Sequence, residues 1–292
     1  MRIVLSLAFL RKTIENITLY TTLVLLCFDV AYAQDDNLIA KLQIKGELTQ
    51  GSALIGMAPK ASVLKLNNVP IKLTDQGGFF IGFGRDAALE QTLRLISASG
   101  DTEIQTLVLT KREYKVQEVN GVPKQTVSPS KEHLKRIREE ATLVKKARAN
   151  VTQQSAFLDK FIVPMKGPIT GVYGSQRIYN GVPKRPHYGL DYAGPVGALV
   201  YAPASGVVSL AHPDMFYSGG TLIVDHGYGV SSSFLHLSEI LVKEGQQIKQ
   251  GDAIAKVGKG GRATGPHLDW RINWFNVRID PLKVLKLSEE LP

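Results

Sequence analysis

The sequence predicts a mainly β protein in which two β-rich regions are joined by one helix. Three observations predict this class. Short β-prone runs separated by turn signals fill the first part of the chain, one amphipathic stretch follows near the middle, and the rest is rich in glycine between short apolar runs. With 292 residues, of which 44% are hydrophobic, the chain can form two domains with cores of their own.

Residues 1–33 are predicted to be a secretory signal peptide. Three basic residues precede an apolar run at 17–28, and the segment ends at Ala31-Tyr32-Ala33. The run is short for a membrane span, and an uncleaved anchor is the alternative. Cys27 follows Leu26, where a lipid-attachment site requires a small residue, so we interpret it as part of the signal. Export then predicts a periplasmic protein that does not depend on disulfides.

The formal net charge of +9 favours anionic partners. Export argues against nucleic acid, which leaves an anionic cell-wall polymer or a membrane surface. The alternative is that lysine and arginine only keep the protein soluble.

Residues 34–120 are predicted to form a small β-sandwich, because several short strands recur with turn signals such as 75–78 and 99–101 between them. No titratable cluster with metal-ligand spacing occurs here. We therefore expect this module to bind or position a partner, such as a cell-wall protein, and not to catalyse. The predicted strands are Lys41–Leu48, Ser62–Leu73, Gly78–Gly82, Leu93–Ala98, Glu103–Leu109 and Tyr114–Val119.

Residues 121–156 are predicted to be a linker followed by one helix, at about 130–149. Ser128-Pro129 is a helix-start signal, and apolar residues then recur at helical spacing. The helix is expected to space or pack the two domains; the alternative is a mobile gate over the site. The apolar face comprises Leu134, Ile137, Ala141, Val144 and Ala147.

Residues 157–292 are predicted to be a second, mainly β domain without a helix, because glycines stand where short apolar strands must turn. Two motifs here carry metal-ligand chemistry, namely His187-Tyr-Gly-Leu-Asp191 and His267-Leu-Asp269, and His236 lies between them. Imidazole and carboxylate groups bind Zn²⁺, and three protein ligands with one open position are typical of hydrolytic zinc sites. The pattern indicates a metallohydrolase.

From about Phe161 to Leu285 the chain resembles the lysostaphin and LytM-type zinc metallopeptidases, which are murein endopeptidases with a β-sheet (duplicated hybrid motif) domain. No single motif is specific to this family, but the order in which the motifs occur is. The resemblance is carried by His187-x-Gly-x-Asp191, Ala202-Pro-Ala-Ser-Gly-Val-Val208, Val224-Asp-His-Gly227, Phe234-Leu-His-Leu-Ser238, the turn region at 245–251 and Thr264-Gly-Pro-His-Leu268.

The resemblance implies one zinc ion with His187 and Asp191 as its first two ligands. It also implies that His236 and His267 assist catalysis without binding the metal. The third ligand of the family is usually a histidine two residues after His267, whereas this sequence has Asp269 there. This position is the one serious departure from the family pattern.

A carboxylate at Asp269 is compatible with metal binding. Residues two apart on a strand point to the same face, so His267 and Asp269 can both face the metal, and carboxylate oxygen binds zinc at nearly the distance of imidazole nitrogen. The ligand set then carries two negative charges in place of one, which would weaken the acidification of bound water. The alternative is a degenerate site without metal.

Two further residues, Arg177 and Asn180, lie just ahead of the first ligand on a predicted loop, where they would grip substrate or form an ordinary turn. His226 is expected to be structural. The function predicted is an exported zinc endopeptidase that cleaves peptidoglycan cross-links. Its alternative is a degenerate LytM-type factor that binds and activates a cell-wall amidase.

Overall fold

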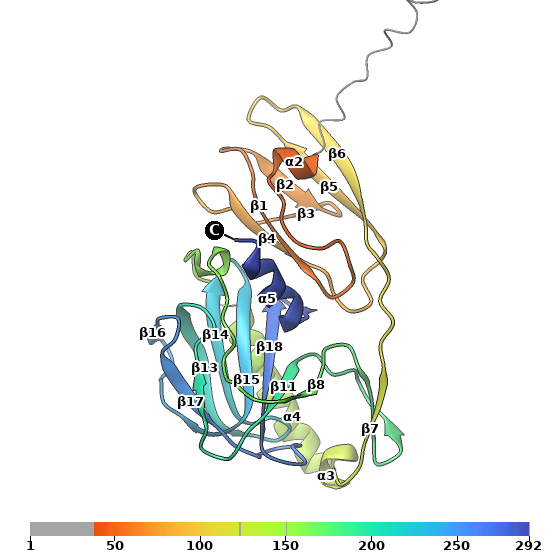
Figure 1. Ribbon diagram of the computed structural model, residues 1–292, viewed down its shortest axis with the longest axis vertical. Helices are drawn as coiled ribbons and strands as arrows, with labels where there is room; N and C mark the ends of the chain where they lie inside the picture. The colour runs from red at the N-terminus through yellow and green to blue at the C-terminus, as the bar shows by residue number, and fades with distance from the viewer. Residues whose placement is uncertain (1–37, 123, 150, 292) are drawn as a thin grey trace, which may run out of the picture. The chain divides into compact units, whose positions relative to one another are not determined.

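The computed structural model describes residues 38–122, 124–149 and 151–291 (Figure 1). The predicted signal peptide and its cleavage site lie outside these residues. The protein is mainly β, with a large β-sheet domain at the C-terminal end, as predicted. Within the described part of the chain, no helix has both the length and the apolar character that a membrane span requires.

The first β-rich region contains two antiparallel sheets. One pairs β1 (Ala53–Met57) with β4 (Gly78–Gly82), and the other has the order β3-β2-β5-β6. The predicted turn at 99–101 does join two neighbouring strands, since the Ser97 amide donates to the Asp101 carbonyl over 2.9 Å. The remaining strands are β2 (Val63–Leu66), β3 (Val69–Pro70), β5 (Glu90–Ile96) and β6 (Thr102–Val108).

The strand predicted at 41–48 was wrong. A short helix, α2 (Leu38–Lys41), ends where it was to begin, and only Lys45 makes an isolated bridge to β1. Gln43 and Gly46 have φ values of 47° and 114°, which turn the chain out of the extended conformation. The β-prone run at 41–48 therefore does not form a strand, and the strand at 53–57 was missed.

Strands β1 and β4 share a core with the C-terminal sheet. Ala53, Ile55 and Phe80 belong to the same buried cluster as Leu190 and Trp270. A methyl group added at Gly82 would lie 2.5 Å from a side-chain carbon of Ile279, so only glycine permits this approach. Apolar burial on both faces of β1 and β4 thus ties the first β-rich region to the sheet that carries the site.

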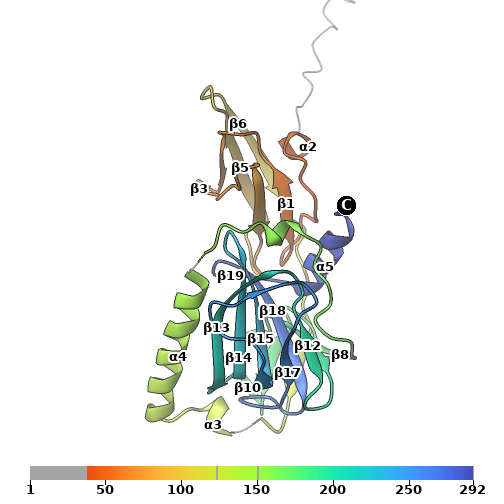
Figure 2. The ribbon, with the colours of Figure 1, turned by 90° about the vertical axis from the view of Figure 1, so that its left-hand side faces the viewer.

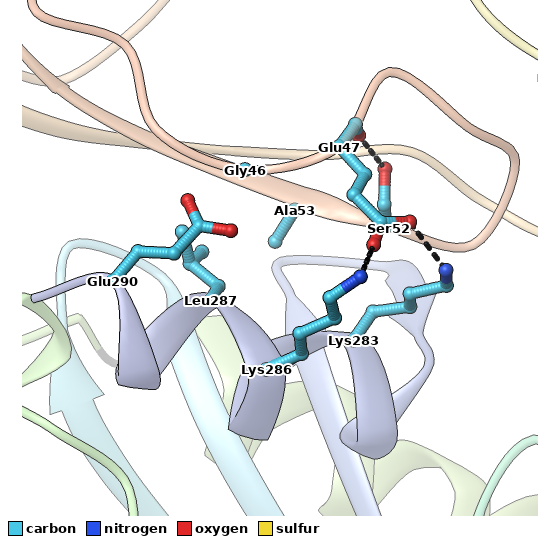
Figure 3. A pocket seen from close by; sticks show the side chains of 8 residues that line it. All are labelled: Gly46, Glu47, Ser52, Ala53, Lys283, Lys286, Leu287 and Glu290. Carbon is cyan, nitrogen blue, oxygen red and sulfur yellow. Dashed lines mark hydrogen bonds and ion pairs between the residues drawn. The ribbon is translucent and has the colours of Figure 1, made fainter.

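Helix α5 (Pro281–Glu289) was not predicted, although its start signal is present. Asp280 caps the helix by accepting the Leu282 amide over 3.0 Å, and proline follows at the first helical position. Arg112 also donates to Asp280 over 3.0 Å. Glu47 pairs with Lys283 and Lys286 on the same helix, as Figure 3 shows. Polar contacts from the first region therefore converge on α5.

The predicted helix is confirmed as α4 (Lys131–Ala149), after a short α3 (Lys124–Val127). It packs against β13 (Gly206–Met215), alongside the C-terminal sheet (Figure 2). Its inner face is rotated from the predicted one: Ala147 is buried and Val144 packs beside it, but Leu134 is exposed. The face is more polar than predicted because Glu140 accepts the Phe216 amide over 2.9 Å.

The C-terminal sheet has the path β16-β13-β14-β15-β18-β11-β8, and each neighbouring pair is antiparallel. Its apolar side packs around Trp270, Phe234 and Leu268, all fully buried. The strands are β8 (Ile169–Gly171), β11 (Leu190–Ala193), β14 (Gly219–Gly227), β15 (Val230–Ile240), β16 (Gln247–Ile248) and β18 (His267–Trp274), with β12 (Leu199–Tyr201), β17 (Ala253–Val257) and β19 (Val277–Ile279) paired beside this path.

A separate strand pairing joins the end of the first β-rich region to the C-terminal domain. Strand β7 (Val116–Val119) runs parallel to β9 (Gln176–Tyr179), which continues into β10 (Val182–Pro183). The segment containing Arg177 is therefore a strand and not the predicted loop.

We predict that Asp280→Ala lowers the free energy of unfolding by about 2 kcal/mol, because it removes a helix cap and leaves the Arg112 guanidinium without its carboxylate. Urea unfolding followed by circular dichroism measures this. Asp75→Ala, on an exposed turn, is the control and should change the value by less than about 0.5 kcal/mol. Equal stability of the two variants would contradict the role given to Asp280.

Candidate metal centre and groove

Two carboxylates and one imidazole meet where β11 and β18 lie side by side. Asp191 on β11 is the direct cross-strand partner of Asp269 on β18, and His187 lies just before β11. Their ligand atoms all lie within 4.8 Å of one another. The three residues are 6%, 5% and 2% exposed for His187, Asp191 and Asp269. The antiparallel register thus brings together the two motifs that are far apart in the sequence.

The donor set fits a divalent cation. His187 Nε2 and Asp191 Oδ1 lie 3.1 Å apart, which is an ion pair when His187 is protonated, and among the described residues neither atom has another partner. Buried polar atoms are rarely left unsatisfied, and a metal ion shared by these two atoms would replace that proton. His187, Asp191 and Asp269 are therefore the residues that would hold a metal.

Two arginines neutralise the carboxylates. Arg177 donates to Asp191 over 3.1 Å, and Arg271 donates to both oxygens of Asp269, with Nε 2.9 Å from Oδ1. Directly opposed like charges destabilise a strand pair, so these cations stabilise the two central strands. Arg271 also offsets the extra negative charge that Asp269 has relative to an imidazole ligand.

Both carboxylates are ionised in this environment. Burial alone would raise the pKa of Asp269, but Arg271 and then His187 outweigh burial and hold the pKa below its usual value. Burial likewise opposes ionisation of Asp191, and the neighbouring His187 brings its pKa below the ordinary value. Ionised carboxylates are the form that binds a metal.

Two glycines make room for these side chains. A methyl group at Gly189 would lie 2.1 Å from Asp269 Oδ1, and one at Gly171 would lie 2.0 Å from Asp191 Oδ2. The glycine in the His187-x-Gly-x-Asp191 motif is therefore required by the close approach of the second carboxylate.

His236 and His267 face each other beside the three ligand candidates, with ring centroids 4.7 Å apart. The Nδ1 of His236 lies 2.9 Å from the Gly260 carbonyl, and that of His267 lies 2.9 Å from the Gly265 carbonyl. A carbonyl only accepts, so each Nδ1 donates, and Nε2 of a neutral ring is left as an acceptor. Burial lowers the pKa of His236 to about 4, which keeps this ring neutral near pH 7.

The backbone of His236 is strained, with φ of 64° in a region that residues other than glycine rarely occupy. Its amide donates to the Ser218 carbonyl over 2.7 Å, and the ring bond to Gly260 fixes the other end. Strain of this kind is concentrated at functional positions.

These residues lie in a groove with a volume of about 690 Å³. Its floor is the polar face of β14, β15 and β18. One wall is α4, which contributes Ile137, Val144 and Arg148, and the opposite wall is formed by residues 184–188 and strand β9. Strand β7 contributes Gln117 and Val119, so parts of the chain well before the metal-ligand motifs complete the groove.

The two residues predicted on the loop have different positions. Arg177 lies in the groove and contacts Asp191. Asn180 instead pairs with the backbone of Val122, donating to its carbonyl over 2.7 Å, and does not line the groove. His226 is fully buried between the Ser205 carbonyl and the Ser232 hydroxyl, at 2.8 Å from each, which is the structural position expected.

Sequence reasoning missed Arg148, Arg271 and Arg278, which all line the groove. For Arg271 a signal existed, because it follows His267 and Asp269 at the same two-residue spacing and so faces the same side of β18. No local pattern indicated Arg148, which comes from α4.

Comparison with known proteins identifies the class. Residues 185–281, which include the three metal-ligand candidates, His236 and His267, match the model of peptidase family M23 as a LytM-type domain. The peptidoglycan DD-endopeptidases ShyB and ShyA of Vibrio cholerae are 42% identical over 100 residues and 38% identical over 139 residues. These matches cover 34% and 46% of this chain, but only 23% and 30% of those proteins.

A crystal structure described as peptidase M23 from Pseudomonas aeruginosa is similar over more of the chain. It has a TM-score of 0.63 at 28% identity and covers 82% of this chain and 95% of that one. The similarity of fold therefore extends beyond the 97 residues of the family match, which span 185–281.

If His187, Asp191 and Asp269 hold a metal, Gly189→Ala is predicted to weaken the binding of added Zn²⁺ by about 10- to 100-fold, because the added methyl group must displace the Asp269 carboxylate. Competition with a chromophoric chelator measures the affinity, and circular dichroism checks that the variant is folded. Gly84→Ala, where the nearest atom to the added methyl group is 3.8 Å away, is the matched control. Unchanged zinc affinity in Gly189→Ala would argue against Asp269 as a ligand.

Proposed function

We propose that this protein is an exported zinc endopeptidase that hydrolyses the peptide cross-links of bacterial peptidoglycan. The observation that carries the proposal is the close approach of His187 Nε2 and Asp191 Oδ1, two buried atoms with no partner but each other among the described residues. They lie in a groove that also contains His236 and His267. Support for the substrate comes from ShyA and ShyB, whose names describe peptidoglycan DD-endopeptidases.

The three residues that would hold one Zn²⁺ are His187, Asp191 and Asp269. When bound there, zinc would polarise the scissile carbonyl and acidify water. Arg177 and Arg271 hold the two carboxylates in place through the hydrogen bonds described above. With Arg271 balancing Asp269, the unit formed by these two side chains has the same net charge as a neutral imidazole ligand.

His236 and His267 would move the protons of the reaction. Each ring has its Nδ1–H fixed by a backbone carbonyl, which orients Nε2 and leaves it able to accept a proton. In the proposed mechanism one of them accepts the proton of the attacking water, and the other stabilises the developing oxyanion or protonates the leaving amine.

Export to the periplasm is also part of the proposal, and its support is the signal-like sequence of residues 1–33. The first β-rich region would bind a cell-wall protein or position the enzyme on the wall. Its support is the exposed edge of that region, where Ile104 and Val108 on β6 are 55% and 64% exposed.

One observation favours a second function, a catalytically inactive factor that activates a cell-wall amidase. Arg271 occupies both oxygens of Asp269, and a buried guanidinium beside a metal site opposes the binding of a cation.

Metal analysis separates the two functions. Protein purified without chelator should contain one zinc ion per chain, and Asp191→Ala should lose it; a chain free of metal and inert even with added zinc would support the activator.

We predict that the protein releases soluble fragments from purified peptidoglycan and that His267→Ala lowers the rate by about 10²- to 10⁴-fold through loss of a proton-transfer group. Mass spectrometry of the fragments identifies the bond that is cut. His212→Ala is the matched control, because His212 is on β13 and does not line the groove. If His267→Ala is as active as the parent protein, His267 has no part in the reaction.

A further inference from the structure

We propose that Arg148 and Arg278 form a subsite for a carboxylate group of the peptide that occupies the groove, so that the protein selects acidic peptides. The inference deepens the proposed function, on which it rests for the identity of the substrate. The subsite itself requires binding only, and its test does not depend on hydrolysis.

The two arginines come from different elements and line the same groove as the metal-ligand candidates. Arg148 is in the last turn of α4, and its Nη2 donates to the Ser233 hydroxyl over 3.1 Å. Arg278 is on β19, where its cross-strand partner is Asn273 of β18. The guanidinium of Arg278 lies 5.7 Å from the Tyr188 ring centroid, a cation–π distance that helps to fix its position.

Positive charge dominates the groove. Its lining includes six arginines and Lys184, but only two acidic residues, Asp191 and Asp269. Both carboxylates are already paired, Asp191 with Arg177 and Asp269 with Arg271. Neither Arg148 nor Arg278 has a carboxylate within 4.0 Å among the described residues, and the Nε of Arg148 has no hydrogen-bond partner there. The six arginines are Arg148, Arg177, Arg185, Arg262, Arg271 and Arg278.

Unpaired guanidinium groups are costly in such a place. Burial, followed by repulsion from Arg278 and Arg271, lowers the pKa of Arg148 to about 8, and burial with the charge of Arg271 lowers that of Arg278 to about 10. Arginine remains charged in proteins, so this unfavourable free energy persists until an anion is bound. A binding site for an anion gives the two residues a role that stability does not explain.

Arg177, Arg271 and Arg262 already have partners and are less suited to this role. Arg262 lies between the rings of Tyr179 and Tyr217, with its guanidinium 4.7 and 4.9 Å from their centroids. Further polar groups near Arg278 are unsatisfied among the described residues, namely the buried amide of Asn273 and the hydroxyl of Ser231, which is opposite Asn273 on β15. Near Arg278, these polar side chains therefore have no hydrogen-bond partners among the described residues.

A peptide carboxylate suits this pair in both charge and shape. The planar guanidinium group forms two parallel hydrogen bonds to a carboxylate, a geometry that an amide cannot reproduce with the same charge. A carboxylate in the subsite would place the peptide between α4 and β19, with its backbone passing Asp269 and the two histidines in the same groove. The arginines would thus select and align a substrate without reacting with it.

The test measures binding in the full chain with His267→Ala, which prevents turnover. The probes are a synthetic D-alanyl cross-linked peptide with free carboxylates and the same peptide with these groups converted to carboxamides. Calorimetry should show that the free acid binds about 10-fold or more tightly than the amide, as expected for charged hydrogen bonds. Arg148→Gln and Arg278→Gln should each reduce this ratio, and Arg148→Lys should retain part of it.

Two controls make the result decisive. Arg138→Gln, on the exposed side of α4, should leave the ratio unchanged. Thermal melting of Arg278→Gln should show unchanged or higher stability, because an uncompensated buried charge has been removed, whereas a purely structural arginine would give lower stability. Equal affinity for the two peptides, or an unchanged ratio in both glutamine variants, would overturn the proposal. A parent protein that fails to hydrolyse peptidoglycan could still bind the free-acid peptide more tightly than the amide. That result would support the subsite and reject only the enzymatic function.

Discussion

The site depends on the direct opposition of Asp191 and Asp269 across the β11 and β18 ladder. Two buried carboxylates that face each other across a strand pair repel each other. The fold keeps them together by placing arginine side chains beside them. Arg177, Arg271 and the glycines at 171 and 189 are all explained by this one constraint. Arg271 thus offsets the negative charge that Asp269 brings to the site.

The strand register also explains which residues can act together. On β18, alternate residues place His267, Asp269 and Arg271 on the groove face, while Leu268 and Trp270 are fully buried in the core behind. The rigid apolar side of the sheet therefore fixes the position of the chemical groups on the other side. Helix α4 and strand β7 add to this platform from outside the sheet, and they set the width and charge of the groove.

The family resemblance, supported by strand alternation at 267–269, singled out His187, Asp191 and Asp269, and the structure brings their ligand atoms within 4.8 Å of one another. Their binding of a metal is a proposal. Reasoning from local patterns failed where tertiary contacts decide the outcome. The β-prone run at 41–48 was overridden by backbone turns at Gln43 and Gly46. The inner face of α4 could not be derived from apolar spacing, since Glu140 and Arg148 on that face bind partners more than 70 residues away. The helix at 281–289 was overlooked despite the Asp280-Pro281 start.

The parallel pairing of β7 with β9 has a consequence for how the parts of the groove are distributed along the chain. The segment shared with family M23 begins at residue 185, yet the helix and strands that wall the groove lie between residues 116 and 179. The metal-ligand candidates and much of the groove wall therefore lie in different stretches of the chain. Changes at residues 116–179 would alter the groove wall without altering the three metal-ligand candidates.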